Sequence, residues 1–168
     1  AHQAGATAQL DDDAWGISAA YTFGGNIKVG FTYLDAEYET APGRTMGKQT
    51  WTLGVDWRLS GPHSLHAQYA YADDTDGNSM VSIGGNGGIT APRSAADLPV
   101  TGTGGDAISL AYQYAFSKRT AVRFGYVRVN NDTNTAAYRI GNTAAHTAVA
   151  PASATGQNVD AFAFHLSH

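Results

Sequence analysis

Hydrophobic and polar residues alternate with a period of two along seven segments of this chain. In the last segment, 158–168, one face carries Phe162, Phe164, Leu166 and His168, and the other carries small or polar side chains. A period of two is that of a β-strand, whose successive side chains point to opposite faces of a sheet. The same alternation predicts six earlier strands, at approximately 14–23, 27–35, 49–59, 64–72, 107–116 and 120–129.

The connections between these strands are alternately short and long. Short turns fall at 24–26, 60–62 and 117–119, and the first holds Gly24 and Gly25, which supply the positive φ angles of a tight hairpin. Long external loops are predicted at approximately 36–48, 73–106 and 130–157. Short turns on one side and long loops on the other are typical of an outer-membrane barrel. The C-terminus is then expected on the short-turn, periplasmic side.

The apolar content excludes a membrane-spanning helix but allows a membrane barrel. The chain has no run of about 18 or more apolar residues, which a transmembrane helix requires. A barrel strand needs only about ten residues, of which every second one is apolar. Charged residues make up only 14% of the chain, against 20 Gly and 9 Tyr, so turns and strands are favoured over helices. The predicted fold class is all-β, a transmembrane antiparallel β-barrel.

Charged residues within the strands support this assignment. Four of them lie on the less apolar face, namely Lys28, Asp56, Arg58 and Arg123. A Lys or Arg that faced lipid at mid-membrane would cost about 2–4 kcal/mol. Asp35 and Arg128 fall on the apolar face, but at strand ends, where the penalty is about 0–1 kcal/mol. The residues expected to line a pore are Lys28, Asp56, Arg58, His66, Gln68 and Arg123.

The aromatic residues of the apolar face sort into two groups along the strands. One group is expected at the outer rim of the membrane and consists of Trp15, Tyr33, Trp51, Tyr71 and Tyr126. The other is expected at the inner rim and consists of Phe23, Trp57, Tyr114 and Phe116. Amphipathic rings gather at the two membrane interfaces of barrel proteins, so these groups predict two aromatic girdles.

Metal chemistry is poorly supported by the sequence. The chain has no cysteine, which excludes disulfides and zinc-thiolate sites. Two histidine pairs, His63 with His66 and His165 with His168, have a spacing of three residues. On a strand this spacing places the two imidazoles on opposite faces, which disfavours chelation. No cofactor is expected.

The chain matches the known calcium-binding, phosphate-binding and serine-hydrolase motifs only in part or not at all. Asp74, Asp76 and Asn78 resemble the start of a calcium loop, but the Gly lies at 77 and no late bidentate Glu follows. Loosely bound divalent cations at the acidic external loops are the corresponding expectation. The segment 84–88 is glycine-rich, but no Lys-Ser or Lys-Thr of a phosphate-binding loop follows. The chain has no G-x-S-x-G motif, so an enzyme is not expected.

A net charge of −4 with a pI near 5.8 argues against nucleic acid as a partner.

Two segments carry a resemblance to a known family. Two segments, F-S-K-R-T-A-V-R-F-G-Y-V-R-V-N-N-D at 116–132 and G-Q-N-V-D-A-F-A-F-H-L-S-H at 156–168, resemble the penultimate hairpin and the closing strand of the general trimeric porins of Gram-negative bacteria, especially the β-proteobacterial type. The resemblance implies that residues 1–168 form about seven C-terminal strands of a 16-stranded barrel. It also implies a homotrimer in the outer membrane, in contact with lipid and lipopolysaccharide, that passes small hydrophilic solutes and ions by passive diffusion.

The end of the chain also bears on this resemblance. Phe162, Phe164, Leu166 and His168 resemble the terminal signal that the barrel-assembly machinery recognises, but the final Phe of the family is absent. We expect the natural polypeptide to continue beyond His168 to such a Phe. Seven strands would leave two unsatisfied edges in lipid, so the chain is expected to be part of a longer protein. An eight-stranded barrel would need a further strand within residues 1–10.

Two other functions remain open at this stage. A structural or adhesive outer-membrane barrel would use the same strands without general pore activity. A soluble ligand-binding β-barrel would instead turn its apolar face inward around a ligand. If the chain does line a pore, three of the four charged strand residues are basic, which predicts a weak preference for anions from this half. The constriction loop of the resembled family belongs to its N-terminal half, so no residue here is assigned to it.

Overall fold

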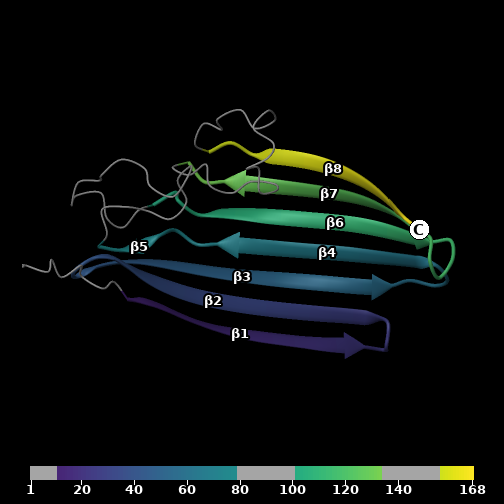
Figure 1. Ribbon diagram of the computed structural model, residues 1–168, viewed down its shortest axis with the longest axis horizontal. Coiled ribbons are helices and arrows are strands. Elements are labelled where there is room, and N and C mark those ends of the chain that lie inside the picture. Colours follow the sequence, from purple (N-terminus) through teal and green to yellow (C-terminus); the bar gives the residue numbers. More distant parts are fainter. Residues whose placement is uncertain (1–10, 79–100, 134–155) are drawn as a thin grey trace, which may run out of the picture.

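The structure, a computed structural model, describes residues 11–78, 101–133 and 156–168, and every regular element in them is a β-strand. The strands form one antiparallel sheet (Figure 1). Their bounds are β1 Asp12–Phe23, β2 Ile27–Ala41, β3 Arg44–Arg58, β4 His63–Ala72, β5 Asp76–Gly77, β6 Gly105–Ala115, β7 Ala121–Asn131 and β8 Val159–Ser167. The order across the sheet is β1-β2-β3-β4-β6-β7-β8, and β5 pairs with β3. The predicted all-β antiparallel fold is confirmed. The sheet is not closed, because the outer edges of β1 and β8 have no neighbour among the described strands.

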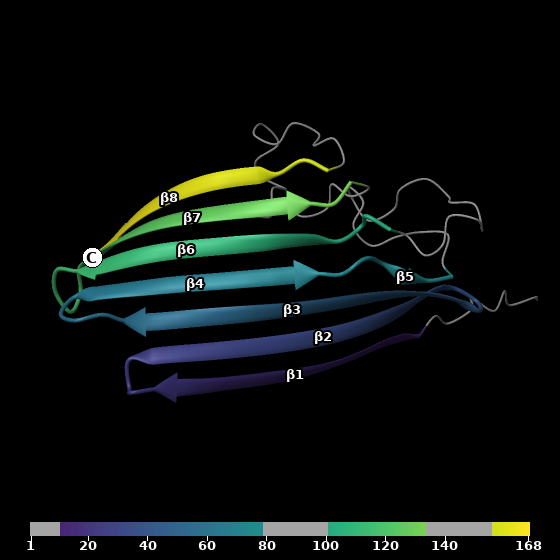
Figure 2. The same ribbon diagram turned by 180° about the vertical axis from the view of Figure 1, so that it is seen from behind.

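Three tight turns lie together at one end of the sheet, which we call the inner end. They join β1 to β2, β3 to β4 and β6 to β7, and the C-terminus lies beside them (Figures 1 and 2). The first turn confirms the predicted glycine geometry, with φ angles of 54° at Gly24 and 74° at Gly25. In the third turn the hydroxyl of Ser117 accepts hydrogen bonds from the backbone N–H groups of Arg119 and Thr120. We call the opposite end of the sheet the outer end.

The prediction of a long loop at 36–48 is wrong. Strands β2 and β3 run through most of this segment and remain paired as far as Ala41 and Arg44, with an irregularity between Glu39 and Ala41. Only Pro42 and Gly43 separate the strands, and Gly43 has a φ angle of 72°. The loop was predicted because apolar alternation stops after residue 35. Beyond a membrane that alternation is not required, and two strands can still satisfy each other's backbone groups in water.

The long connection predicted at 73–106 is also structured at both ends. After β4 the chain bulges at 73–75 and then resumes pairing with β3 through β5, where Gly77 lies opposite Met46 and Asp76 opposite Gly47. Gly77 adopts a φ of 97°, and a Cβ there would lie 2.4 Å from the carbonyl oxygen of Thr45. Only glycine therefore fits at this position. Strand β6 begins at Gly105, and residues 79–100 lie outside the described part of the chain.

The third predicted loop, 130–157, begins later than expected, because β7 continues to Asn131. Residues 134–155 lie outside the described residues. The remaining strand bounds agree with the predicted ones to within two residues at each end. The added feature is the two-residue strand β5, which is too short to give a periodic signal.

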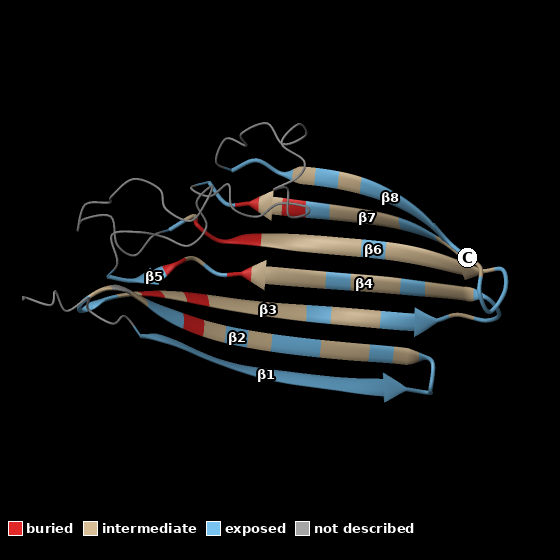
Figure 3. Ribbon diagram, in the orientation of Figure 1, coloured by how far each residue is buried: buried red, intermediate tan, exposed pale blue. Residues whose placement is uncertain are grey.

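The distribution of buried residues is the reverse of that in a soluble protein. The aromatic and aliphatic side chains of one face are exposed, with Phe162 at 84% and Phe164 at 64% of their full accessible areas. The buried residues gather instead at the outer end of the sheet, on β2, β3, β4, β6 and β7 and in the described segments next to them (Figure 3). An apolar face of this size exposed along a whole sheet marks a surface that meets another protein or lipid.

Candidate functional site

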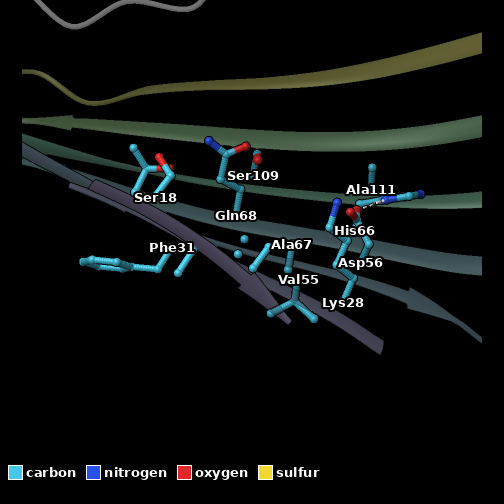
Figure 4. Close-up of a pocket in the computed structure, with 15 residues that line it drawn as sticks. Ser18, Lys28, Phe31, Val55, Asp56, His66, Ala67, Gln68, Ser109 and Ala111 are labelled. Carbon is cyan, nitrogen blue, oxygen red and sulfur yellow. Dashed lines mark hydrogen bonds and ion pairs between the residues drawn. The ribbon is translucent and has the colours of Figure 1, made fainter. Parts of the chain in front are cut away.

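The opposite, polar face of the sheet is hollowed. Five adjacent strands, β1, β2, β3, β4 and β6, contribute to one open cavity of about 580 Å³. Residues of its wall include Ser18, Lys28, Asp56, His66, Gln68 and Ser109 (Figure 4). Because directly paired residues of an antiparallel ladder lie on the same face, the strand register shows which side chains share this surface. The cavity therefore lies on the polar face over these five strands.

One row of this face holds three ionisable residues on neighbouring strands. Lys28 on β2 is paired with Asp56 on β3, and Asp56 is paired with His66 on β4. The His66 Nδ1 atom lies 2.6 Å from the Asp56 Oδ1 atom, and the two side chains are 36% and 60% exposed (Figure 4). An ion pair as exposed as this adds at most about 1 kcal/mol of stability. Its main effect is on the charge of the wall. We call Lys28, Asp56 and His66 the charged row.

A second polar row lies one step nearer the inner end. It runs through Arg58, Ser64, Gln113, Arg123 and His165, on β3, β4, β6, β7 and β8. Arg123 donates from Nε and Nη2 to the Gln113 Oε1 atom, at 3.2 and 2.6 Å. On the other side of the charged row, Gln68 follows Gly54 and Gly30 in a row of mostly small residues. All six predicted lining residues therefore lie on the polar face.

The sequence placed His165 on the small or polar face of the last segment, but the predicted pore-lining residues did not include it. Its position is odd, like those of Ala161 and Ala163, which form the small-residue side of β8. The register places His165 opposite Arg123. The period-two pattern therefore contained the signal that assigns His165 to the polar face.

The polar face is basic. Within the described strands its cationic residues are Lys28, Arg44, Lys48, Arg58 and Arg123. Its carboxylates within the same strands are Asp12, at the outer end of β1, and Asp56 in the charged row. Near the middle and inner end of the sheet, Asp56 is thus the one described carboxylate that offsets the basic side chains. A permeating or bound anion would meet a favourable field there.

The outer end of the polar face holds a compact hydrogen-bonded group, which we call the outer node: Lys48, Asp73, Asp74, Thr75, Thr103 and Gly104. Lys48 is 7% exposed, and its Nζ atom donates to the carbonyl oxygens of Asp73 and Thr103. The Asp74 Oδ1 atom accepts the backbone N–H groups of Thr103 and Gly104, at 2.7 and 2.9 Å. Thr75 and Thr103 are each only 1% exposed. The node therefore ties β3 to both ends of the segment between β4 and β6.

Opposing effects act on the pKa values of Lys48 and Asp74 in the node. Burial lowers the pKa of Lys48, although the neighbouring Asp74 and Asp73 carboxylates oppose that shift. Partial burial by itself would raise the pKa of Asp74. The backbone N–H groups of Gly102, Gly104 and Thr103, with the Lys48 ammonium, outweigh it and bring the pKa below its ordinary value. Asp74 therefore favours its ionised form in the folded protein.

The period-two sequence pattern does not predict the outer node. Its contacts join residues 25 to 55 positions apart, and most of them use backbone groups. The nearby residues Asp74, Asp76 and Asn78 resemble the start of a calcium loop in sequence. In the structure, Asn78 and Asp74 accept hydrogen bonds from backbone N–H groups. The Asn78 Oδ1 atom accepts the N–H of Thr45 at 2.8 Å, and Asp74 binds backbone N–H groups.

The predicted interfacial aromatics lie on the apolar face, and several are in contact. Trp15 packs on Tyr33 at a ring-centroid distance of 5.3 Å, Trp51 on Tyr71 at 5.7 Å, and Tyr114 on Phe116 at 4.8 Å. Tyr33, Trp51 and Tyr71 occupy one register row near the outer end, whereas Phe23 and Trp57 share a row near the inner end. Tyr126 lies outside the outer row. It pairs with Leu110 and Phe162, and its hydroxyl donates to Asp160 near the start of β8.

Two charged residues on this apolar face have polar neighbours at the outer end. The Asp35 carboxylate accepts a hydrogen bond from Gln49 at 3.5 Å, and the Arg128 Nε atom donates to Asn130 Oδ1 at 2.9 Å. The four C-terminal residues compared with an assembly signal are also placed. Phe162, Phe164 and Leu166 are exposed, while the His168 ring lies 2.9 Å from the Thr120 hydroxyl.

The histidine pairs are arranged as their spacing predicts. His63 lies on the apolar face, paired with Tyr114 and hydrogen bonded to the Tyr112 hydroxyl, while His66 lies on the polar face. Within the described ranges no group of three or more His, Cys, Asp or Glu side chains is arranged to hold a metal ion. Among the same residues, no helix has the length and hydropathy needed to span a membrane.

Comparison with known proteins gives one match. A family model described as Gram-negative porin matches residues 1–134, which is most of the chain. No curated protein and no solved structure matches.

Proposed function

Because the chain belongs to the Gram-negative porin family, we propose that its sheet forms part of the wall of a water-filled channel for passive diffusion of ions and small hydrophilic solutes. Family membership supports a channel of the outer membrane rather than an enzyme. The proposal of a water-filled channel rests chiefly on one observation, that one face of the sheet is apolar and the other is polar. Its apolar face is exposed along all seven long strands, and its other face is polar, is hollowed by the cavity and carries Lys28, Asp56, Arg58 and Arg123.

The two solvents on either side of a barrel wall explain this division. Apolar side chains facing lipid lose nothing by being exposed, whereas Arg58 or Arg123 turned toward mid-membrane lipid would cost about 2–4 kcal/mol each. A slip of one residue in register would exchange the two faces of a strand. The long ladders, such as the 12 paired positions between β1 and β2, hold that register.

The proposal includes closure of the sheet and assembly into trimers. The outer edges of β1 and β8 would leave unsatisfied N–H and C=O groups in a bilayer. We propose that further strands close the barrel, sixteen in all, and that three barrels associate in contact with lipopolysaccharide. These features follow the resemblance of segments 116–132 and 156–168 to the general trimeric porins. The inner end would face the periplasm. No cofactor belongs to the proposal, and divalent cations would be held only loosely at the acidic outer end.

Conductance in planar lipid bilayers tests this function. The purified protein should give steady current steps whose size increases with salt concentration, as expected for a water-filled pore. A protein that inserts into the bilayer but gives no steps would be a structural or adhesive barrel. Extraction from cells without detergent would instead support a soluble ligand-binding barrel. Either result would contradict the proposal.

Neutralising the basic side chains of the polar face should shift ion selectivity toward cations. A unit charge about 8 Å from an ion interacts by about 0.5 kcal/mol in water, and physiological salt reduces this to about 0.2 kcal/mol. The effect has opposite signs for anions and cations, so their permeability ratio should fall about twofold for each charge removed. The variants are Lys28→Gln, Arg58→Gln and Arg123→Gln, measured by reversal potential in a salt gradient.

A matched control is available in the turn between β6 and β7. The double variant Lys118→Gln, Arg119→Gln removes as many charges as Arg58→Gln, Arg123→Gln, but from exposed turn residues at the inner end. We expect the control to shift the reversal potential less than the double variant of the polar face. Equal shifts would show that the polar-face charges have no special access to the permeating ion.

A further inference from the structure

We propose that His66 makes the ion selectivity of the channel depend on pH, because protonation of its ring changes the net charge of the charged row. This inference rests on the proposed channel function and names one residue that sets its specificity. His66 lies near the middle of β4, on the polar face, and lines the cavity of about 580 Å³. A permeating ion would pass this part of the wall.

The charged row is balanced when His66 is neutral. The Lys28 ammonium and the Asp56 carboxylate then contribute opposite charges on neighbouring strands. When the His66 ring takes up a proton, the row gains one positive charge. Other carboxylates of the described strands do not compensate, because Asp12, the remaining one on this face, lies at the outer end of β1.

The site of proton uptake follows from the hydrogen bonding of the ring. The Nδ1 atom is 2.6 Å from the Asp56 Oδ1 atom, so its hydrogen is shared with the carboxylate. The Nε2 atom is shielded and has no hydrogen-bond partner among the described residues. The neutral ring therefore carries its hydrogen on Nδ1, and a second proton enters at Nε2 when the side chain turns that atom toward the water of the cavity. Histidine is the side chain whose ordinary titration falls between about pH 5 and 8.

The surroundings of His66 on each neighbouring strand are defined by the register. From β3, Asp56 lies directly opposite and Arg58 lies one step toward the inner end. From β6, the facing residue is Ala111, flanked on the same face by Ser109 and Gln113. On β4 itself the same-face neighbours are Ser64 and Gln68. Asp56 attracts the imidazolium, and Arg58 and the more distant Lys28 repel it. These three are the charged groups that face His66 within the described strands.

The test compares two histidines on one strand. His66 faces the cavity, whereas His63, three residues earlier, lies on the apolar face against Tyr114. Reversal potentials of the full-length protein in planar bilayers under a tenfold KCl gradient give the anion-to-cation permeability ratio at pH 8 and pH 5. We expect the wild-type ratio to rise about twofold or more on acidification, as one added charge implies. His63→Gln should keep this rise.

His66→Gln should reduce the rise by about twofold, the contribution of one charge. His165, on the same face near the inner end, can add a second charge, so the double variant His66→Gln, His165→Gln should reduce the rise by about a further twofold. The inference would be overturned if His66→Gln kept the full wild-type rise, or if His63→Gln lost as much of it. Conductance steps at pH 8 report the channel separately, so a pore without pH-dependent selectivity would contradict this inference and leave the proposed function standing.

Discussion

Val55→Arg should destabilise the membrane-inserted protein by about 2–4 kcal/mol, the penalty for an arginine on the lipid face near mid-membrane. Val55 lies on the apolar face of β3, between Trp51 and Trp57 of the two predicted aromatic girdles, and is paired with Val29 and Ala67. The measurement is the free energy of unfolding from lipid vesicles in a urea or guanidinium titration.

The neighbouring residue gives the matched control. Gly54 lies on the polar face, and a Cβ built there meets no atom within 4 Å. Gly54→Arg therefore has room for its side chain and access to water, and we expect a change of no more than about 0.5 kcal/mol, as for an ordinary exposed substitution. Equal destabilisation by the two variants would show that the two faces do not meet different solvents.

Asp74→Ala should loosen the outer node and destabilise the protein by about 2–3 kcal/mol. The substitution leaves the N–H groups of Thr103 and Gly104 without their acceptor and removes a carboxylate that offsets the buried Lys48 ammonium. Hydrogen bonds to charged groups contribute about 1.5–3 kcal/mol, and an unpaired buried charge adds to the loss. Asp76→Ala is the control, because Asp76 is exposed at its position in β5, and we expect a change within about 0.5 kcal/mol.

The Asp74 carboxylate also makes the stability of the folded protein depend on pH, and the direction of its pKa shift gives the sign. The pKa of Asp74 is lower in the folded protein than its ordinary value of 3.8, so the unfolded chain binds this proton more readily. The stabilisation is therefore complete above about pH 5 and is lost as the pH falls below 3.8 through the folded value. Asp74→Asn should lose less stability than the wild type between pH 5 and pH 3. An identical loss in both proteins would exclude Asp74 as its source.

The sequence predicted the strands and their faces best where a lipid environment would restrict which residue types can occur. Residues such as Phe162 and Phe164 recur at every second position because a slip would place them in water, and this constraint allowed the strands and their faces to be predicted. The strand register then followed from the turns, as at Gly24 and Gly25. The polar face was predicted for the same reason, through charges such as Arg58 and Arg123 that lipid excludes.

The prediction was wrong where no lipid acts on the chain. Between Ala36 and Lys48 the apolar alternation ends, yet the backbone continues to pair. The outer node was missed because Lys48, Asp74 and Thr103 are far apart in sequence and meet through carbonyl and N–H groups, which leave no side-chain pattern. His165 was assigned to the small or polar face from its parity but was left out of the predicted pore lining. Long-range backbone contacts set the outer end, and a period-two pattern cannot report them.

The central claim is that the polar face lines water in which ions move, and thiol modification of neighbouring residues tests it most directly. The chain has no cysteine, so each introduced thiol is the one reactive site in it. Gln68 lies on the polar face and borders the cavity, and Ala67 is turned to the apolar face opposite Val55. In single channels of Gln68→Cys, a bulky charged methanethiosulfonate reagent should reduce the current in a discrete step. Ala67→Cys should keep its current. A current block in Ala67→Cys without one in Gln68→Cys would contradict the account.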